Sequence, residues 1–140
     1  MRKLGIVGNK FYVNKTQLKD FLWLVKQQAQ SLDPPEEIEV ISLGRKISID
    51  KQIKKLAELH EMKYAEFIPY HDKWNPACIE KPYLFNKEYS PKYFFIAYTH
   101  FVKYCDSVLI LDTDEGQDSA IAYIKKICQK QKKHYIILKV

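Results

Sequence analysis

The stretch from Cys105 to Lys126 constrains the fold more than any other part of the sequence. Ser107–Leu111 is a short run of aliphatic and β-branched residues, typical of a strand buried on both faces. Asp112–Gly116 then breaks the pattern, and from Ser119 the apolar residues return at helical spacing. In an open parallel sheet, such a turn lies at the carboxyl edge, where these sheets bind ligands. A plain connecting turn is the alternative interpretation.

The same alternation of strand and helix runs along the whole chain. Strand-like runs are Leu4–Val7, Glu37–Leu43, Tyr64–Tyr70, Ser107–Leu111 and Tyr135–Val140, separated by helical patterns at 14–31, 48–60, 91–104 and 119–133. This order predicts an α/β fold, with one Rossmann-like three-layer domain over residues 1–140. Its five-stranded, mainly parallel sheet would be covered on both faces, with strand order 3-2-1-4-5.

Composition narrows the class of protein. The chain is 46% hydrophobic, which indicates a folded domain rather than a disordered one. No apolar run approaches the roughly 20 residues that span a bilayer, and the first residues show no signal-peptide pattern, so we expect no membrane partner. Cys78, Cys105 and Cys128 form no CxxC pair. We therefore expect a reducing, cytoplasmic location and no zinc site. We assign no other metal site and no resident cofactor to the chain.

The net charge of +6 has a simple structural interpretation. Much of the excess lies on the last predicted helix, at Lys125, Lys126, Lys130, Lys132 and Lys133. A solvated helix face accounts for such a pattern, and a general attraction for anionic ligands follows from it. No recognised nucleic-acid motif is present in the sequence, so we do not expect a nucleic-acid partner.

Two turns of the predicted sheet edge carry cations. In the first, Gly8 lets a ligand approach the backbone, Asn9 can hydrogen-bond a neighbour or a ligand, and Lys10 suits phosphate. In the second, Gly44-Arg45-Lys46 brings positive charge to the same edge. Neither turn is a GxGxxG motif or a P-loop, and plain β-to-α turns are the alternative.

The helix after the second turn carries two further polar residues near its start. We expect Ser48 to cap this helix, and Asp50 lies in its first turn, where an acid favours the helix dipole.

The turn after the fourth strand is acidic instead. Its acids are Asp112, Asp114, Glu115 and Asp118, and its candidate ligand-binding residues are Asp112, Gly116, Gln117, Asp118 and Ser119. Four acids at one helix start repel a bare phosphate, but they suit ribose hydroxyls, a base amino group or a divalent cation. We therefore expect phosphate near the first turn and sugar or base near this one. Asp118 or Ser119 can cap the helix.

An aromatic-rich loop over residues 71–90 is the remaining irregular segment. It carries Trp74, Tyr83, Phe85 and Tyr89, and loops of this length are usually functional when they are not disordered. We interpret it as a lid in which Trp74 stacks on a base or sugar. Packing or an oligomer contact is the alternative, and Trp23 can likewise reach a dimer surface.

Several short matches to one family are distributed along the chain. They are Gly8-Asn9-Lys10 for a G-S-R type turn, Ser42, Gly44 and Asp50 for parts of S-G-G-x-x-G-x-D, Trp74 after the third strand, Cys105-Asp106 for alanine-aspartate, and Gly116-Gln117 for a G-T step. In these motifs the chain resembles the SLOG superfamily of Rossmann-like proteins. It is similar to the YspA/YpsA-like branch and more distantly similar to the lysine-decarboxylase-like LOG and DprA folds. Divergent small members of this kind also resemble phage or mobile-element proteins.

This resemblance implies a pocket for a nucleotide or nucleotide-derived molecule, because family members bind nucleotides and some branches hydrolyse them. The chain departs from the pattern at Leu43 and Ile47, where glycines are expected, and at Ala97-Tyr98, where an Arg-Asn pair is expected. The resemblance therefore implies a nucleotide-like pocket with altered chemistry.

Three functions are compatible with these observations. The first, which we favour, is binding of a nucleotide-like small molecule. The second is an enzyme that cleaves an N-glycosidic or phosphoribosyl bond, with Asp112 or Glu115 as nucleophile or base. The third is a ligand-free interaction protein that uses the aromatic loop and the face around Trp23. We expect a homo-oligomer under all three.

Overall fold

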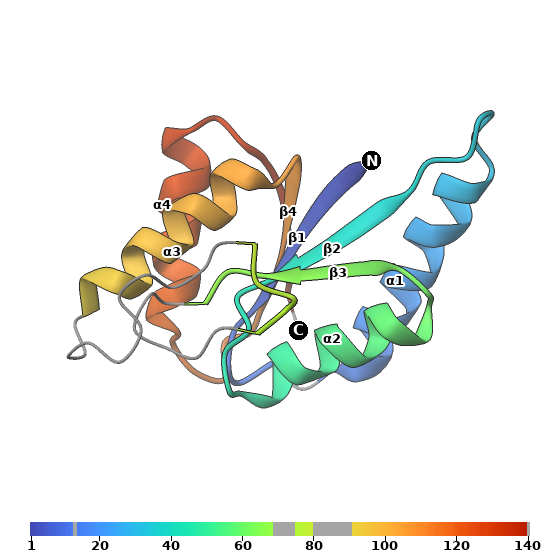
Figure 1. The fold of residues 1–140 in the computed structure, drawn as a ribbon. Coiled ribbons are helices and arrows are strands. Elements are labelled where there is room, and N and C mark those ends of the chain that lie inside the picture. Colours follow the sequence, from blue (N-terminus) through green and yellow to red (C-terminus); the bar gives the residue numbers. More distant parts are fainter. Residues whose placement is uncertain (13, 69–74, 80–90, 140) are drawn as a thin grey trace.

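The computed structural model describes residues 1–12, 14–68, 75–79 and 91–139 (Figure 1). In chain order the elements are β1 (Arg2–Gly8), α1 (Lys15–Gln30), β2 (Ile38–Ser42), α2 (Ser48–Leu59), β3 (Lys63–Glu66), α3 (Pro91–Tyr104), β4 (Ser107–Asp112), α4 (Ser119–Lys130) and β5 (His134–Lys139). All neighbouring strands pair in parallel, in the order β3-β2-β1-β4-β5. The α/β class, the Rossmann-like architecture and the predicted strand order are thereby confirmed.

The helices cover the two faces of the sheet in pairs. Figure 1 shows α3 and α4 on one side of the strands and α1 and α2 on the other. Right-handed crossovers produce this division, because the chain moves outward from β1 through α1 and α2, then returns past β1 and moves the other way through α3 and α4. The connections after β1 and β4 consequently lie at the same edge, where the strand order reverses.

Each face has its own apolar core. On the side of α1 and α2, Ile6 and Leu109 of the sheet pack with Leu18, Leu22 and Ile53. On the side of α3 and α4, the corresponding core residues of the strands are Val7, Ile41, Val108 and Ile110, which pack against Phe101 and Ile124. Neighbouring residues of β1 and β4 thus point to opposite faces, and both strands are buried almost throughout. This burial holds the two central turns in place.

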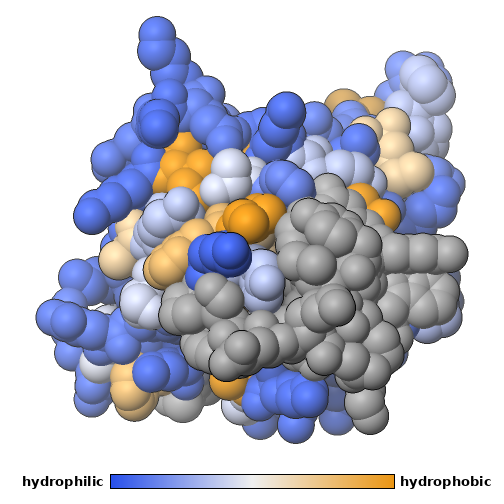
Figure 2. Space-filling model, turned by 60° about the vertical axis from the view of Figure 1, so that its left-hand side comes forward, coloured by the Kyte–Doolittle hydropathy of each residue, from blue (hydrophilic) through white to orange (hydrophobic). Residues whose placement is uncertain are grey.

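The side of α3 and α4 also carries exposed apolar groups. Phe95 and Ile96 of α3 are partly exposed, and the Phe95 ring lies 4.6 Å from the ring of Tyr123 on α4. Figure 2 brings this side forward and shows hydrophobic surface between hydrophilic areas. No helix of the described residues is long and apolar enough to cross a membrane.

Several predicted boundaries need correction. The third strand ends at Glu66 rather than Tyr70, because its partner strand β2 ends at Ser42, the register partner of Glu66. On the other edge of β3, the Glu66 N–H donates to the Ala77 carbonyl and the Glu66 carbonyl accepts from the Ile79 N–H, which bring the chain back beside β3. The last helix ends at Lys130, and Lys132 has a φ of 54°. Lys132 and Lys133 therefore lie beyond the helix on which the sequence pattern placed them.

The predicted cap of α2 is also wrong. Ser48 is the first helical residue, and Ile47, at the N-cap position, makes no side-chain cap bond. The Asp50 carboxylate lies in the first turn and accepts a hydrogen bond from the Arg45 N–H instead. The acid of the first turn thus anchors the loop that precedes the helix.

Candidate functional site

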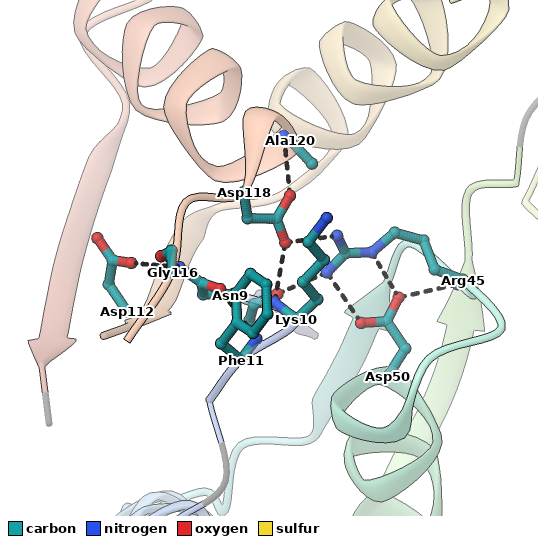
Figure 3. Close-up of polar contacts among 10 residues, drawn as sticks. Asn9, Lys10, Phe11, Arg45, Asp50, Asp112, Gly116, Asp118 and Ala120 are labelled. Carbon is teal, nitrogen blue, oxygen red and sulfur yellow. Dashed lines mark hydrogen bonds and ion pairs between the residues drawn. The ribbon is translucent and has the colours of Figure 1, made fainter. Parts of the chain in front are cut away.

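The first and fourth turns meet at the carboxyl edge of the sheet. The Asn9 N–H donates to the Leu111 carbonyl, and the Asn9 side-chain amide donates to Asp112 Oδ1 at 3.0 Å and to the Gly116 carbonyl at 2.9 Å. Asn9 is buried, so these bonds satisfy an amide that has lost most of its water. The structure therefore brings Asn9 and Gly116 together, as the sequence analysis required of a common site (Figure 3).

The turn after β2 reaches the same place through Arg45. The Arg45 guanidinium donates from Nε and Nη2 to the two oxygens of Asp50, each at 3.1 Å. Its Nη1 lies 3.0 Å from Asp118 Oδ2, and its Nη2 also donates to the Gly8 carbonyl at 2.6 Å. Figure 3 shows this side chain extended between the two carboxylates. All three guanidinium nitrogens are thus used inside the protein.

Burial makes these ion pairs structural. The side chains of Arg45, Asp50 and Asp118 are only 13%, 2% and 6% exposed. Burial opposes the charge on Arg45, but the nearby carboxylates of Asp50 and Asp118 outweigh it and raise the pKa of Arg45. The sequence analysis placed Arg45 among the cations of the ligand-binding edge, whereas its guanidinium joins three loops of the protein.

Asp118 holds the start of α4. Its Oδ1 accepts from the Ala120 N–H at 3.0 Å, as an N-cap does, and its Oδ2 accepts from the Lys10 N–H at 2.9 Å. The cap role predicted for Asp118 is confirmed. With Arg45 as its third partner, this buried carboxylate connects all three turns. Both of its oxygens are bound within the protein, so its role is structural.

Asp112 is also engaged within the protein. Its oxygens accept from Asn9, from the Thr113 N–H and from Lys125 Nζ, the last at 2.6 Å. Partial burial alone would raise the pKa of Asp112, but these hydrogen bonds together hold it below its ordinary value. Asp112 is therefore an ionised carboxylate with a fixed orientation.

The acids of the fourth turn are largely neutralised by cations. Asp112 pairs with Lys125, Asp118 pairs with Arg45, and Asp114 lies 2.8 Å from Lys139. The expected repulsion of a phosphate rested on four uncompensated acids at this turn, and three of them have a cationic partner. Glu115 is exposed, and its N–H lies near the Thr113 hydroxyl.

An open hollow of about 930 Å³ lies beside these groups. Its walls come from the first turn, the fourth turn and the first three turns of α4, and they include Asn9, Lys10, Asp112, Gly116, Gln117, Asp118, Ser119, Lys125 and Lys126. Of the other sequence-predicted site residues, Gly8, Gly44, Arg45 and Lys46 do not line it. Trp74 lies outside the described residues.

Gly44 has a conformational role next to this site. Its φ of 64° is in the left-handed region, and a Cβ there would lie 2.9 Å from side-chain atoms of Glu66 and Ile68. The glycine that the sequence analysis assigned to ligand binding is therefore required by the turn itself.

Sequence reasoning missed two features of the hollow. Lys125 and Lys126 were interpreted only as a solvated face, although both line the hollow and Lys125 binds Asp112. Phe11 packs so closely on Gly116 that a Cβ at Gly116 would lie 2.3 Å from the ring. Helical spacing could have indicated that these lysines lie near the fourth turn, since Lys125 and Lys126 are within two helical turns of Ser119. No local pattern signals the packing of Phe11 on a residue so distant in the chain.

Potential metal ligands do not cluster in the part of the chain that the structure describes. Among residues 1–12, 14–68, 75–79 and 91–139, no three His, Cys, Asp or Glu side chains group in a way that could hold a metal ion. The nearby acids bind lysine, arginine and backbone N–H groups instead.

Comparison with known proteins identifies similar folds but no close relative. No protein-family model matches the sequence, and no curated protein matches it. Two solved structures of the molybdenum cofactor carrier protein from Chlamydomonas reinhardtii resemble it, at 14% and 16% identity and TM-scores of 0.60 and 0.59. The matches cover 100% and 99% of this chain and 79% and 77% of the carrier protein chains. At this identity the likeness shows a Rossmann-like fold.

Proposed function

We propose that this protein binds a small anionic molecule of the nucleotide type in the hollow between the first turn and α4. The observation that carries this proposal is the set of three lysines, Lys10, Lys125 and Lys126, on the wall of a hollow where the strand order reverses. Ligands of open α/β sheets bind at this position. As part of the same proposal, we assign the chain to the SLOG-type nucleotide binders.

The lysines of the wall that take part in no ion pair within the described part of the chain favour an anionic ligand. Lys125 is matched by Asp112, Asp118 by Arg45 and Asp114 by Lys139. The other two lysines of the wall, Lys10 and Lys126, belong to none of these three ion pairs. Lysine ammonium groups are suited to phosphate as point charges, so the proposed phosphate lies between the first turn and α4. This revises the orientation expected from the sequence, in which phosphate avoided the fourth turn.

The remaining groups of the wall suit the neutral part of such a ligand. Gln117, Ser119 and Gln129 are exposed polar side chains that can donate or accept hydrogen bonds. Phe11 lies at the first turn, with Lys10 Nζ 5.4 Å from its ring centroid. Phe11 does not itself line the hollow, but an exposed aromatic ring beside a cation is suited to a flat ring system such as a base.

The test is calorimetric titration with a panel of nucleoside monophosphates, ADP-ribose, cyclic dinucleotides and, because of the similar carrier protein, the molybdenum cofactor. We expect one of them to bind, with affinity reduced about tenfold or more by Lys10→Ala and by Lys126→Ala. Lys130→Ala is the matched control, because Lys130 is an exposed lysine of the same helix outside the hollow. Absence of binding by every ligand, or equal losses in all three variants, would contradict the proposal.

We propose binding without turnover, because Asp112 is held within the protein and Glu115, the other candidate carboxylate, does not line the hollow. A nucleophile or base needs a carboxylate oxygen directed at the substrate, whereas both oxygens of Asp112 already accept hydrogen bonds. Incubation with nucleoside monophosphates, followed by chromatography for free base, separates the two functions. Release of base that is lost in Asp112→Asn or Glu115→Gln would favour the glycosidase alternative.

A further inference from the structure

A second hollow lies on the opposite side of the sheet from α3 and α4. It has a volume of about 350 Å³ and is found at the amino ends of β1, β2, β4 and β5, beside α1. Its apolar walls include Phe21 and Val25 of α1, Leu32 two residues beyond the end of α1, and Leu4, Leu109 and Ile136 from the sheet. It is remote from the candidate ligand site, because the two lie at opposite ends of the strands.

The topology explains why this face is open. Right-handed crossovers put α1 and α2 over the half of the sheet that contains β2 and β3, so within the described residues no helix follows on this side of β5. Ile136 of β5 is 47% exposed, although Leu109, its register partner on β4, is buried. The sequence analysis predicted a sheet covered on both faces, and the edge strand β5 departs from this. A parallel sheet face of this kind is normally covered.

We propose that a second copy of this chain covers this face, in a two-fold symmetric dimer in which α1 of each copy packs across β5 of the other. The partner's α1 would supply the layer that the fold leaves out beside β5. In such an isologous contact the same apolar surface serves both copies.

The charges of the face favour an identical partner. The ionisable residues that line the hollow are one arginine, one glutamate and one histidine, Arg2, Glu36 and His134. With a neutral histidine they sum to no net charge, although the chain as a whole carries +6. A strongly acidic or basic partner would gain little here, whereas a two-fold axis can set Arg2 of each copy toward Glu36 of the other. The excess positive charge, which would separate two copies, lies elsewhere.

The size of the face also agrees with a dimer. Helix α1 has 16 residues, and at 1.5 Å per residue its length is about 24 Å. The width from α1 across β4 to β5 is about 20 Å, from one helix diameter and two strand spacings of about 5 Å. The plan area is then about 500 Å², which falls in the range of the smaller specific interfaces, below about 600 Å² on each partner, so we expect a weak, concentration-dependent dimer.

This proposal excludes Trp23, the aromatic residue that the sequence analysis associated with a dimer. Trp23 does not line the hollow. It lies two positions after Phe21 in the helix, which turns it about 200° around the α1 axis. Trp23 and Leu32 are nevertheless similarly exposed, at 52% and 50%, so they make a matched pair for mutation.

The test is sedimentation velocity of the full chain over a range of concentrations. We expect a dimer whose association is weakened at least about tenfold by Ile136→Asp and by Leu32→Lys. Ile137→Asp and Trp23→Lys should leave it intact, because Ile137 is exposed on the other face of the same strand and Trp23 on the other side of α1. Circular dichroism and melting curves establish that each variant is folded.

A monomer at every concentration would overturn the proposal. So would equal dissociation by Ile136→Asp and Ile137→Asp, since that result indicates pairing of β5 edges rather than contact through one face. Dissociation by Trp23→Lys alone would move the interface to the opposite side of α1 and would overturn it as well.

Discussion

Arg45 Nη1 lies 3.0 Å from Asp118 Oδ2, which links the turn after β2 to the start of α4 across 73 residues of sequence. The same guanidinium binds both oxygens of Asp50 and the Gly8 carbonyl. Three loops that carry the candidate site are therefore held by one side chain. A planar guanidinium can do this because its donors point in fixed, divergent directions.

Removal of this side chain should destabilise the fold strongly. Arg45→Met leaves two buried carboxylates, Asp50 and Asp118, without their cation, and we expect a loss of about 3–5 kcal/mol in the free energy of unfolding. Arg45→Lys should recover only part of it, because a lysine cannot bind both Asp50 oxygens and Asp118 together. Urea unfolding measures both variants.

The control for this change is Lys46→Met, which removes the neighbouring, exposed cation of the same turn. We expect it to alter stability by less than about 1 kcal/mol. A loss for Arg45→Met no greater than that of the control would show that the buried pairs contribute little.

Gly116 and Phe11 should be energetically coupled. A Cβ at Gly116 would lie 2.3 Å from the Phe11 ring, so Gly116→Ala must displace that ring. We expect Gly116→Ala to cost about 1–3 kcal/mol on its own and clearly less when Phe11→Ala is already present. A double-mutant cycle by thermal or urea unfolding gives the coupling energy. Additive effects would mean that the glycine is needed for a reason other than the ring.

We expect the free energy of unfolding to decrease at acid pH, partly because Asp112 becomes protonated. Its pKa is depressed in the folded protein from an ordinary value of 3.8, because Lys125, Asn9 and the Thr113 N–H bind the ionised form and outweigh partial burial. The stabilisation is therefore complete above about pH 5, begins to decline near the ordinary pKa, and is lost once the pH is below the depressed value. We expect about 1 kcal/mol, since the pair with Lys125 is partly exposed.

The measurement is the stability difference between the unmodified chain and Asp112→Asn from pH 7 to pH 2. This difference should shrink as the pH falls. Asp114→Asn is the matched control, because Asp114 is 84% exposed and its pair with Lys139 lies at the surface. A difference for Asp112→Asn that does not change with pH would exclude its titration as the cause.

Much of the fold followed from local patterns. The strands β1 and β4 are apolar runs bounded by polar turns, and α3 over Pro91–Tyr104 begins and ends where its sequence pattern indicated. Hydrophobic periodicity and turn residues act over a few neighbours, so the sequence exposes them directly. The end of β3 at Glu66 did not follow, because it coincides with the end of its partner β2 at Ser42, and the extent of pairing between two strands is not a local property of either one.

The roles of the residues at the candidate site could likewise be predicted only in part. The cap role of Asp118 could be predicted, since a cap concerns the first turn of its own helix. The roles of Arg45 and Asp112 could not be predicted, because the partners of a charged side chain are set by residues that arrive from other loops. A sequence shows that a charge is present but not which opposite charge will satisfy it.

The sequence by itself determined the order of strands and helices and the edge at which the first and fourth turns would lie, because periodicity and the handedness of crossovers are properties of short segments. Only the tertiary structure decided which cations line the open hollow, which serve as internal counterions, and which face of β5 stays open. Those outcomes depend on distances between residues far apart in the chain, and electrostatic and packing energies act over a few ångströms of space.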